Sequence, residues 1–234
     1  MHSISLTYQD QRGFAFFVMV NPGGVISPLL ANLHMRRLVL GWKKLGLDRR
    51  LGAQIVTYAD DLVICCKRSA DEALRALHVI MGKLGLTVNE EKTRLCRIPQ
   101  DTFDFLGYTF GRCCSPQTGR AYIGSRPSKK SIRRLTASIR AQTDRGLCGL
   151  EATQVAGRLN RMLVGWANYF CMGPVGKAYR AVDAYATARL RRWLCRKHKV
   201  RGGGYTRFSD GYLRQRLGLV CLPARRQRGP CAMA

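Results

Sequence analysis

Two adjacent aspartates stand between two runs of apolar residues in segment 55–66, which reads IVTYADDLVICC. Short runs of this kind around a polar pair predict a β-hairpin whose turn carries Asp60 and Asp61. Neighbouring carboxylates repel each other unless a cation lies beside them. Carboxylate oxygens suit Mg²⁺, which binds through one or two of them together with substrate phosphates. The segment therefore predicts either a metal-dependent phosphoryl-transfer site or a solvated turn, since aspartate is also common in turns.

The chain carries a net charge of +26, from 40 lysines and arginines against 14 aspartates and glutamates. A field of this sign recruits polyanions, and nucleic acid is the usual one. Residues 1–125 carry 16 basic and 10 acidic side chains, whereas residues 126–234 carry 24 and 4. The longest apolar runs are too short and too interrupted to cross a bilayer. We therefore expect a nucleic-acid partner, no membrane, and different roles for the two halves.

The ten cysteines show no C-x-x-C spacing and form no zinc-ligand pattern with the four histidines. Adjacent cysteines on a strand point to opposite faces and rarely share a metal ion. Reduced, mostly buried thiols are typical of a cytosolic protein, and the N-terminus lacks the pattern of a signal peptide. These observations predict a cytoplasmic localisation.

The first half of the chain predicts helices alternating with short strands. Ser27 is suited to cap one helix, and Ser69 with Glu72 forms a capping box that opens another. Strands are expected at residues 86–88, 103–110 and 121–123. The inward face of the first helix is expected to carry Leu30, Leu33, Leu38, Trp42 and Leu45.

The second half predicts three helices between Ser128 and residue 200. Apolar residues recur there at helical spacing, and arginine or lysine fills much of the remaining surface. Three glycines at residues 202–204 interrupt this pattern. The tail that follows is basic and only weakly structured by its pattern.

Four segments follow one another in a fixed order: GGVISPLLANL from Gly23, YADD from Tyr58, GLTVNEEKT from Gly85, and FLGY from Phe105. In this order and spacing they resemble the palm of group II intron reverse transcriptases. The segment GWANYF at residues 165–170 resembles the maturase-specific region of the same family. Ordered motifs are far more specific than any one of them alone.

The resemblance implies an α+β fold with two parts. A partial reverse-transcriptase palm, an antiparallel sheet with helices, is expected over residues 23–125, and an α-helical thumb/maturase domain over residues 126–200. Residues 1–22 are expected to be a non-matching leader, and residues 201–234 a basic C-terminal tail.

The resemblance also assigns roles at the polymerase site. In the family two metal ions clamp the attacking oxygen and the triphosphate, which implies Mg²⁺ bound directly by Asp60 and more peripherally by Asp61. Lys92 would lie near the leaving pyrophosphate. Nucleotide or template contacts are implied for Gly23, Gly24, Tyr58 and Ala59, and a primer grip for Leu106, Gly107 and Tyr108.

Each of these roles has an ordinary local alternative. The glycine pair suits a tight turn, Tyr58 suits strand packing, and a single lysine is usually solvated. Gly107 could mark a bulge in a core strand.

In the helical part, cations are expected on phosphates and exposed aromatic rings on unpaired bases. Most of its aromatic residues fall on apolar stripes and are expected in the core. The candidate RNA-binding residues are Arg158, Arg161, Lys177, Arg180, Arg189, Arg191, Arg192, Arg196 and Lys197.

The sequence departs from the family upstream of the glycine pair. The family has a further metal-binding aspartate there, whereas the sole acid among residues 1–22 is Asp10, in different surroundings. Asn21-Pro22 also stands where the family usually has Pro-Gln. We therefore expect a C-terminal piece that lacks the fingers and the first palm motif. With one metal ligand fewer, the isolated chain is predicted not to extend a primer.

The implied function is that of an RNA-directed DNA polymerase and intron maturase. Its partners would be intron RNA, an RNA/DNA hybrid and, in the intact family, deoxynucleoside triphosphates. One alternative is a catalytically inactive RNA-binding maturase fragment that assists splicing. Another is a polyanion-binding protein without specificity.

Overall fold

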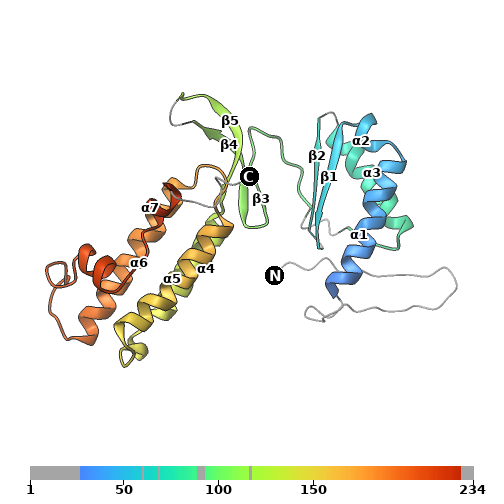
Figure 1. Ribbon diagram of the computed structural model, residues 1–234. Coiled ribbons are helices and arrows are strands. Elements are labelled where there is room, and N and C mark those ends of the chain that lie inside the picture. Colours follow the sequence, from blue (N-terminus) through green and yellow to red (C-terminus); the bar gives the residue numbers. More distant parts are fainter. Residues whose placement is uncertain (1–26, 60, 68, 89–92, 116–117, 228–234) are drawn as a thin grey trace. The chain divides into compact units, whose positions relative to one another are not determined.

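The computed structural model describes residues 27–59, 61–67, 69–88, 93–115 and 118–227 (Figure 1). The chain forms two compact units that divide between Cys96 and Arg97, and each unit has its own apolar core. This division differs from the boundary expected near residue 126, because the strands that follow Arg97 cluster with the helical part.

The first unit packs helices against one side of a two-stranded hairpin (Figure 1). Strands β1 and β2 pair antiparallel, with Ala53 opposite Cys66 and Tyr58 opposite Asp61. Ile55, Leu62 and Ile64 pack against the buried cluster from this hairpin. The elements are α1 (Ser27–Lys44), α2 (Leu47–Arg50), β1 (Ala53–Tyr58), β2 (Asp61–Cys66) and α3 (Ala70–Lys83).

Trp42 lies at the centre of this core with no exposed surface, and its indole Nε1 donates to the Ala53 carbonyl at 2.9 Å. Met35 and Leu38 are buried on the same face of α1. The expected inward face of this helix was partly wrong, because Leu33 and Leu45 are 51% and 58% exposed. The buried stripe is shifted to Met35, and Leu45 comes after the last residue of α1.

The Ser69 cap of α3 is confirmed, since its hydroxyl accepts from the Glu72 amide at 3.2 Å, while the Glu72 carboxylate pairs with Arg50. The strand expected at residues 86–88 is wrong. The Leu86 amide donates to the Met81 carbonyl at 2.8 Å, and Gly85 has φ +68°. The Leu86 amide therefore caps the C-terminus of α3, an arrangement that commonly follows a glycine in the left-handed conformation, and residues 86–88 do not pair with a strand.

The second unit begins with a three-stranded antiparallel sheet in the order β3-β4-β5. The strands are β3 (Phe103–Phe105), β4 (Tyr108–Cys114) and β5 (Ala121–Pro127). The single strand expected at residues 103–110 is wrong, because a two-residue turn at Leu106 and Gly107 divides it into β3 and β4.

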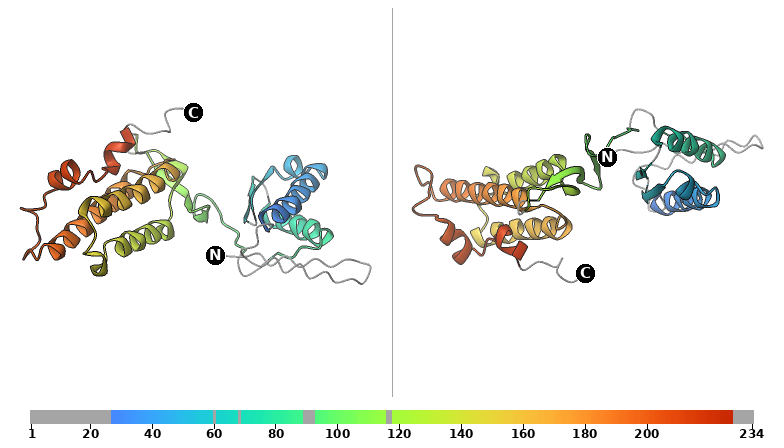
Figure 2. Two further views of the ribbon diagram at one scale, coloured as in Figure 1. Left: turned by 60° about the horizontal axis from the view of Figure 1, so that its bottom comes forward. Right: turned by 90° about the horizontal axis from the view of Figure 1, so that it is seen from above.

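Three long helices follow the sheet and lie side by side (Figure 2). The Ser128 cap is confirmed, with its hydroxyl accepting from the Ser131 amide at 3.1 Å. Buried leucines and valines from all three helices form the core. The elements are α4 (Lys129–Gln142), the short 3₁₀ helix η1 (Arg145–Leu147), α5 (Ala152–Tyr169) and α6 (Gly176–Lys197).

The segment after the glycines is more ordered than expected. It contains a turn of π-helix, η2 (Tyr212–Arg216), and a last helix, α7 (Leu222–Gln227). Phe208, Leu213 and Leu222 are buried in the helical core. The expectation of a weakly structured tail is therefore wrong up to residue 227, and residues 228–234 lie outside the described part.

Candidate metal and nucleic-acid sites

The turn between β1 and β2 holds the aspartate pair. The strand register pairs Tyr58 with Asp61, which leaves residues 59 and 60 as a two-residue loop. Ala59 has φ +52°, and both favoured two-residue hairpin turns require a positive φ at this first position. Asp61 is the exposed first residue of β2, and the Tyr58 ring is 63% exposed instead of packed.

The donor atoms at this turn fit a divalent cation. Asp60 lies outside the described residues, but it is adjacent to Asp61 in the sequence, so the chain supplies two neighbouring carboxylates here. Within the described residues no group of three or more histidine, cysteine, aspartate or glutamate side chains could hold a metal. The pair would therefore need further oxygen ligands from water or from a bound phosphate, which Mg²⁺ commonly keeps.

Three other predicted site residues, Gly23, Gly24 and Lys92, also lie outside the described residues.

The turn between β3 and β4 holds the predicted primer-grip residues. Leu106 and Gly107 have φ +50° and +78°, and a positive φ at both central positions is the mark of a type I′ turn. Gly107 is therefore a turn residue and not a bulge in a continuous strand. A Cβ at Gly107 would lie 3.0 Å from the Phe170 ring, so the close approach of this ring, just after the end of α5, also favours glycine here.

Arg191, a candidate RNA contact, is instead buried inside the second unit with 5% exposure. Its Nε donates to the Phe208 carbonyl at 2.8 Å, and its Nη2 pairs with Asp210. The Tyr205 ring lies 4.3 Å from its guanidinium carbon. Arg191 therefore ties the C-terminal segment to α6, and a phosphate contact is not supported.

Arg189 and Lys197 also have partners inside the protein. Arg189 donates to the Thr143 hydroxyl at 3.0 Å and to carbonyls at the end of α4. The Lys197 ammonium donates to the Cys148 and Leu150 carbonyls at 3.1 and 2.9 Å. Cations commonly satisfy the last carbonyls of helices in this way, so these two side chains hold the connections between helices.

Asp183 and Arg214 form another tie to the C-terminal segment. The buried Asp183 accepts from Arg214 Nη2 at 2.8 Å and from the Leu222 amide at 3.0 Å. Burial by itself disfavours the charge on Arg214, but the hydrogen bond and the opposite charge of Asp183 raise the pKa of Arg214. The charged pair is therefore favoured in the folded unit.

The other candidate RNA-binding residues remain at the surface. Arg158 is half-buried, and the rest are exposed: Arg161, Lys177, Arg180, Arg192 and Arg196. Sequence reasoning did not single out a further exposed group on α4, whose members are Lys129, Lys130, Arg133 and Arg134. Their spacing of i, i+1, i+4 and i+5 was the available signal, because it places them together on one helix face.

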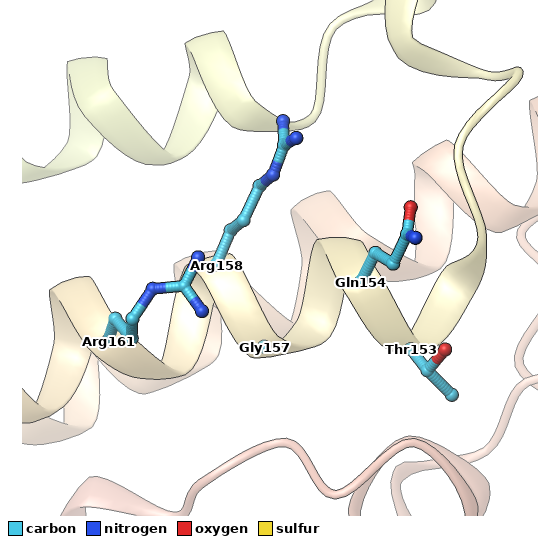
Figure 3. Close-up of a pocket in the computed structure, with 5 residues that line it drawn as sticks. All are labelled: Thr153, Gln154, Gly157, Arg158 and Arg161. Carbon is cyan, nitrogen blue, oxygen red and sulfur yellow. The ribbon is translucent and has the colours of Figure 1, made fainter.

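A shallow depression lies on α5 and is lined by Thr153, Gln154, Gly157, Arg158 and Arg161 (Figure 3). Arg158 extends away from α5 toward the pale green helix α4, while Arg161 runs along α5 in the direction of Arg158. A Cβ at Gly157 would meet nothing within 4 Å. Internal packing therefore does not require this glycine, which costs a helix interior about 1 kcal/mol relative to alanine.

No helix within the described ranges has the length and apolar character needed to cross a bilayer.

Two protein-family models match the chain. The model described as reverse transcriptase (RNA-dependent DNA polymerase) matches residues 2–110. The model described as group II intron, maturase-specific domain, matches residues 132–212. The first match includes residues 2–22, which corrects the expectation that this segment does not resemble the family. A search of curated proteins finds no match.

The maturase match spans most of α4, all of α5 and α6, and the part of the following segment that holds Phe208 and Asp210, the partners of Arg191. The reverse transcriptase match spans the aspartate hairpin and ends within β4. The two matches come in the order that the sequence motifs predicted and together cover most of the chain. The chain therefore belongs to the group II intron reverse transcriptase/maturase family.

Proposed function

We propose that the exposed basic face of α4 and α5 binds intron RNA through its phosphates. The observation that supports this is the division of the cations in the second unit. Arg189, Arg191 and Lys197 bond to the protein itself, whereas Arg158 and Arg161 border an open depression on α5. Guanidinium groups beside an open stretch of helix surface suit a phosphate backbone, because the planar guanidinium presents its N–H donors in a fixed fork that matches phosphate oxygens.

The test compares intron RNA with a scrambled RNA of equal length over a series of salt concentrations. Each phosphate contact that is removed should lower the slope of log K against log salt by about 1. For the variant Arg158→Gln/Arg161→Gln, the slope of log K against log salt should therefore fall in magnitude by about 2, and the affinity for intron RNA at moderate salt should fall about tenfold.

A matched control is Arg36→Gln/Arg37→Gln, which removes two exposed arginines from α1 in the first unit. This control should bind intron RNA as the unmodified chain does. Equal affinity of the unmodified chain for intron and scrambled RNA would indicate a polyanion binder without specificity and would contradict the proposal.

We further propose that Asp60 and Asp61 hold Mg²⁺ and that deoxynucleoside triphosphates are the substrates at this turn. The bound ion would neutralise phosphate charge and orient the reacting oxygens. The turn places Asp61 at the start of a paired strand, so its backbone needs little rearrangement to meet a cation. Lys92 is proposed beside the leaving pyrophosphate, Gly23 and Gly24 beside the template, and Tyr58 and Ala59 beside the nucleotide.

Titration with Mg²⁺, followed by NMR shifts of residues 58–61, tests the metal proposal. The variants Asp60→Asn and Asp61→Asn should each weaken the response, with the larger loss for Asp60→Asn, and should leave the affinity for intron RNA unchanged. An undiminished response in Asp60→Asn would contradict it. Primer extension adds a separate test: Mg²⁺-dependent extension that disappears in Asp60→Asn would overturn the expectation that this chain alone does not copy.

A further inference from the structure

The β3–β4 turn holds a bulky residue in an unfavourable conformation. Leu106 has φ +50° and is only half-buried, and a large side chain with positive φ is a genuine outlier. An Asn-Gly turn would reach the same geometry more cheaply. Backbone outliers of this kind persist only where surrounding structure holds them, and they gather at functional sites.

The structure holds this turn through hydrogen bonds from distant parts of the chain. The Tyr169 hydroxyl, at the end of α5, donates to the Leu106 carbonyl at 2.9 Å. The Ser128 amide donates to the Gly107 carbonyl at 2.8 Å. In return, the Tyr108 hydroxyl donates to the Tyr169 carbonyl at 2.6 Å. Each tyrosine hydroxyl therefore donates across to the other segment, that of Tyr169 to the turn and that of Tyr108 to the end of α5.

A set of aromatic rings fixes the end of α5 against the turn. The centroid of the Phe170 ring lies 4.9 Å from that of Tyr108 and 5.1 Å from that of Trp166. The Tyr179 hydroxyl donates to the Ala167 and Phe170 carbonyls at 2.9 and 3.1 Å. Tyr169 differs from its neighbours, because its side chain is 54% exposed and its hydroxyl reaches the turn. Core packing alone does not account for that hydroxyl.

We propose that Tyr169 is a positioning residue that holds the Leu106-Gly107 turn in the shape that contacts a primer strand. The motif at residues 165–170 then acts on the turn through the Tyr169 hydroxyl. The helices of the second unit would thereby set the geometry of the primer contact, which serves the copying of RNA into DNA. This inference rests on the primer-grip role assigned to the turn, and it gives Tyr169 a part that direct stacking on RNA would not explain.

The variant Tyr169→Phe removes the hydroxyl and keeps the ring. We expect about fivefold weaker binding of a recessed RNA template–DNA primer duplex, as the loss of one net hydrogen bond predicts. Binding of single-stranded intron RNA should stay unchanged, and the thermal unfolding midpoint should fall by only a few degrees, because one intramolecular hydrogen bond is lost. Tyr122→Phe, at an exposed tyrosine of β5, is the matched control and should bind both nucleic acids normally.

The variant Tyr108→Phe and the double variant complete a double-mutant cycle. The double variant should bind the duplex about as well as whichever single variant loses more affinity, because both hydroxyls hold the same turn. An additive loss would overturn the proposal, as would unchanged duplex binding by Tyr169→Phe or an equal loss on both nucleic acids.

The inference and the intron-RNA proposal fail on different measurements. An unmodified protein that binds intron RNA but not the duplex would overturn the role of Tyr169 and leave the RNA proposal intact. A protein that binds the duplex in a Tyr169-dependent way, without preference for intron RNA, would do the reverse.

Discussion

The two hairpin turns reach similar backbone geometry by different means. Ala59 and Leu106 both occupy the left-handed region, with φ +52° and +50°. The first turn closes a ladder of six residue pairs, whereas the second closes a ladder of three. The shorter ladder is supplemented by Tyr169, which bonds to the turn from the end of α5, and by Ser128, which extends the pairing of β5 with β4 as far as Gly107. A longer ladder can hold an unfavourable turn by itself, while a short one depends on tertiary contacts.

The same contrast extends to the two compact units. The first unit rests on apolar packing around Trp42, with an exposed ion pair between Arg50 and Glu72. The second unit adds buried polar ties, among them Asp183 with Arg214. Exposed pairs contribute little to stability, whereas breaking a buried pair is costly. The difference predicts unequal responses to single substitutions.

The largest effect is expected for Asp183→Asn. It removes a charge from a buried carboxylate that accepts from Arg214 and from the Leu222 amide. The free energy of unfolding of the second unit should fall by about 3 kcal/mol, because the Arg214 charge loses its partner. Chemical denaturation measures this change. The control Glu72→Gln acts on side chains that are 61% and 43% exposed and should cost under about 1 kcal/mol; equal costs would remove the contrast between the units.

Gly107→Ala should have the next largest effect. The new Cβ would lie 3.0 Å from the Phe170 ring at φ +78°, so conformational cost and overpacking add to about 2–3 kcal/mol. The control Gly119→Ala has φ +65° but no atom within 4 Å, and it should cost about 1 kcal/mol. If denaturation gives the same loss for both, Phe170 does not constrain the second turn.

A smaller effect of opposite sign is expected for Ala59→Gly. Glycine adopts the left-handed conformation of Ala59 without the Cβ penalty but loses more chain entropy on folding. The stability of the first unit should therefore rise by up to about 1 kcal/mol, measured by urea denaturation. A fall in stability would show that the Ala59 side chain has contacts that outweigh its backbone strain.

The smallest effect is a difference in reactivity between the two adjacent thiols of the first hairpin, Cys65 and Cys66. Burial, and to a lesser degree the neighbouring Cys65, raise the pKa of the Cys66 thiol. A raised pKa leaves less thiolate at a given pH, and the thiolate is the reactive form. At pH 8, iodoacetamide should therefore modify the exposed Cys65 first, and modification of Cys66 should accelerate as pH rises. Mass spectrometry of the variants Cys65→Ser and Cys66→Ser measures the two rates of modification. Equal rates at pH 8 would contradict the prediction that Cys66 is less reactive than Cys65.

The sequence by itself determined the local features of this protein. Alternating apolar runs around Asp60 and Asp61 predicted the first hairpin, and the caps at Ser69 and Ser128 were correct because each depends on residues three positions apart. The family followed from four motifs in order, which need no knowledge of their contacts. The concentration of positive charge after residue 126 was also visible without coordinates.

Only the tertiary structure decided which cations are available and how the second turn is held. Arg191 and Arg192 are adjacent and alike in sequence, yet Arg191 is buried and pairs with Asp210, whereas Arg192 is exposed. The Tyr169 hydroxyl reaches the Leu106 carbonyl across 63 positions of the chain, and Phe208, Leu213 and Leu222 complete a core most of whose members come from α4 to α6. Periodicity places a residue on a face of its own element but carries no information about the distant group that meets that face.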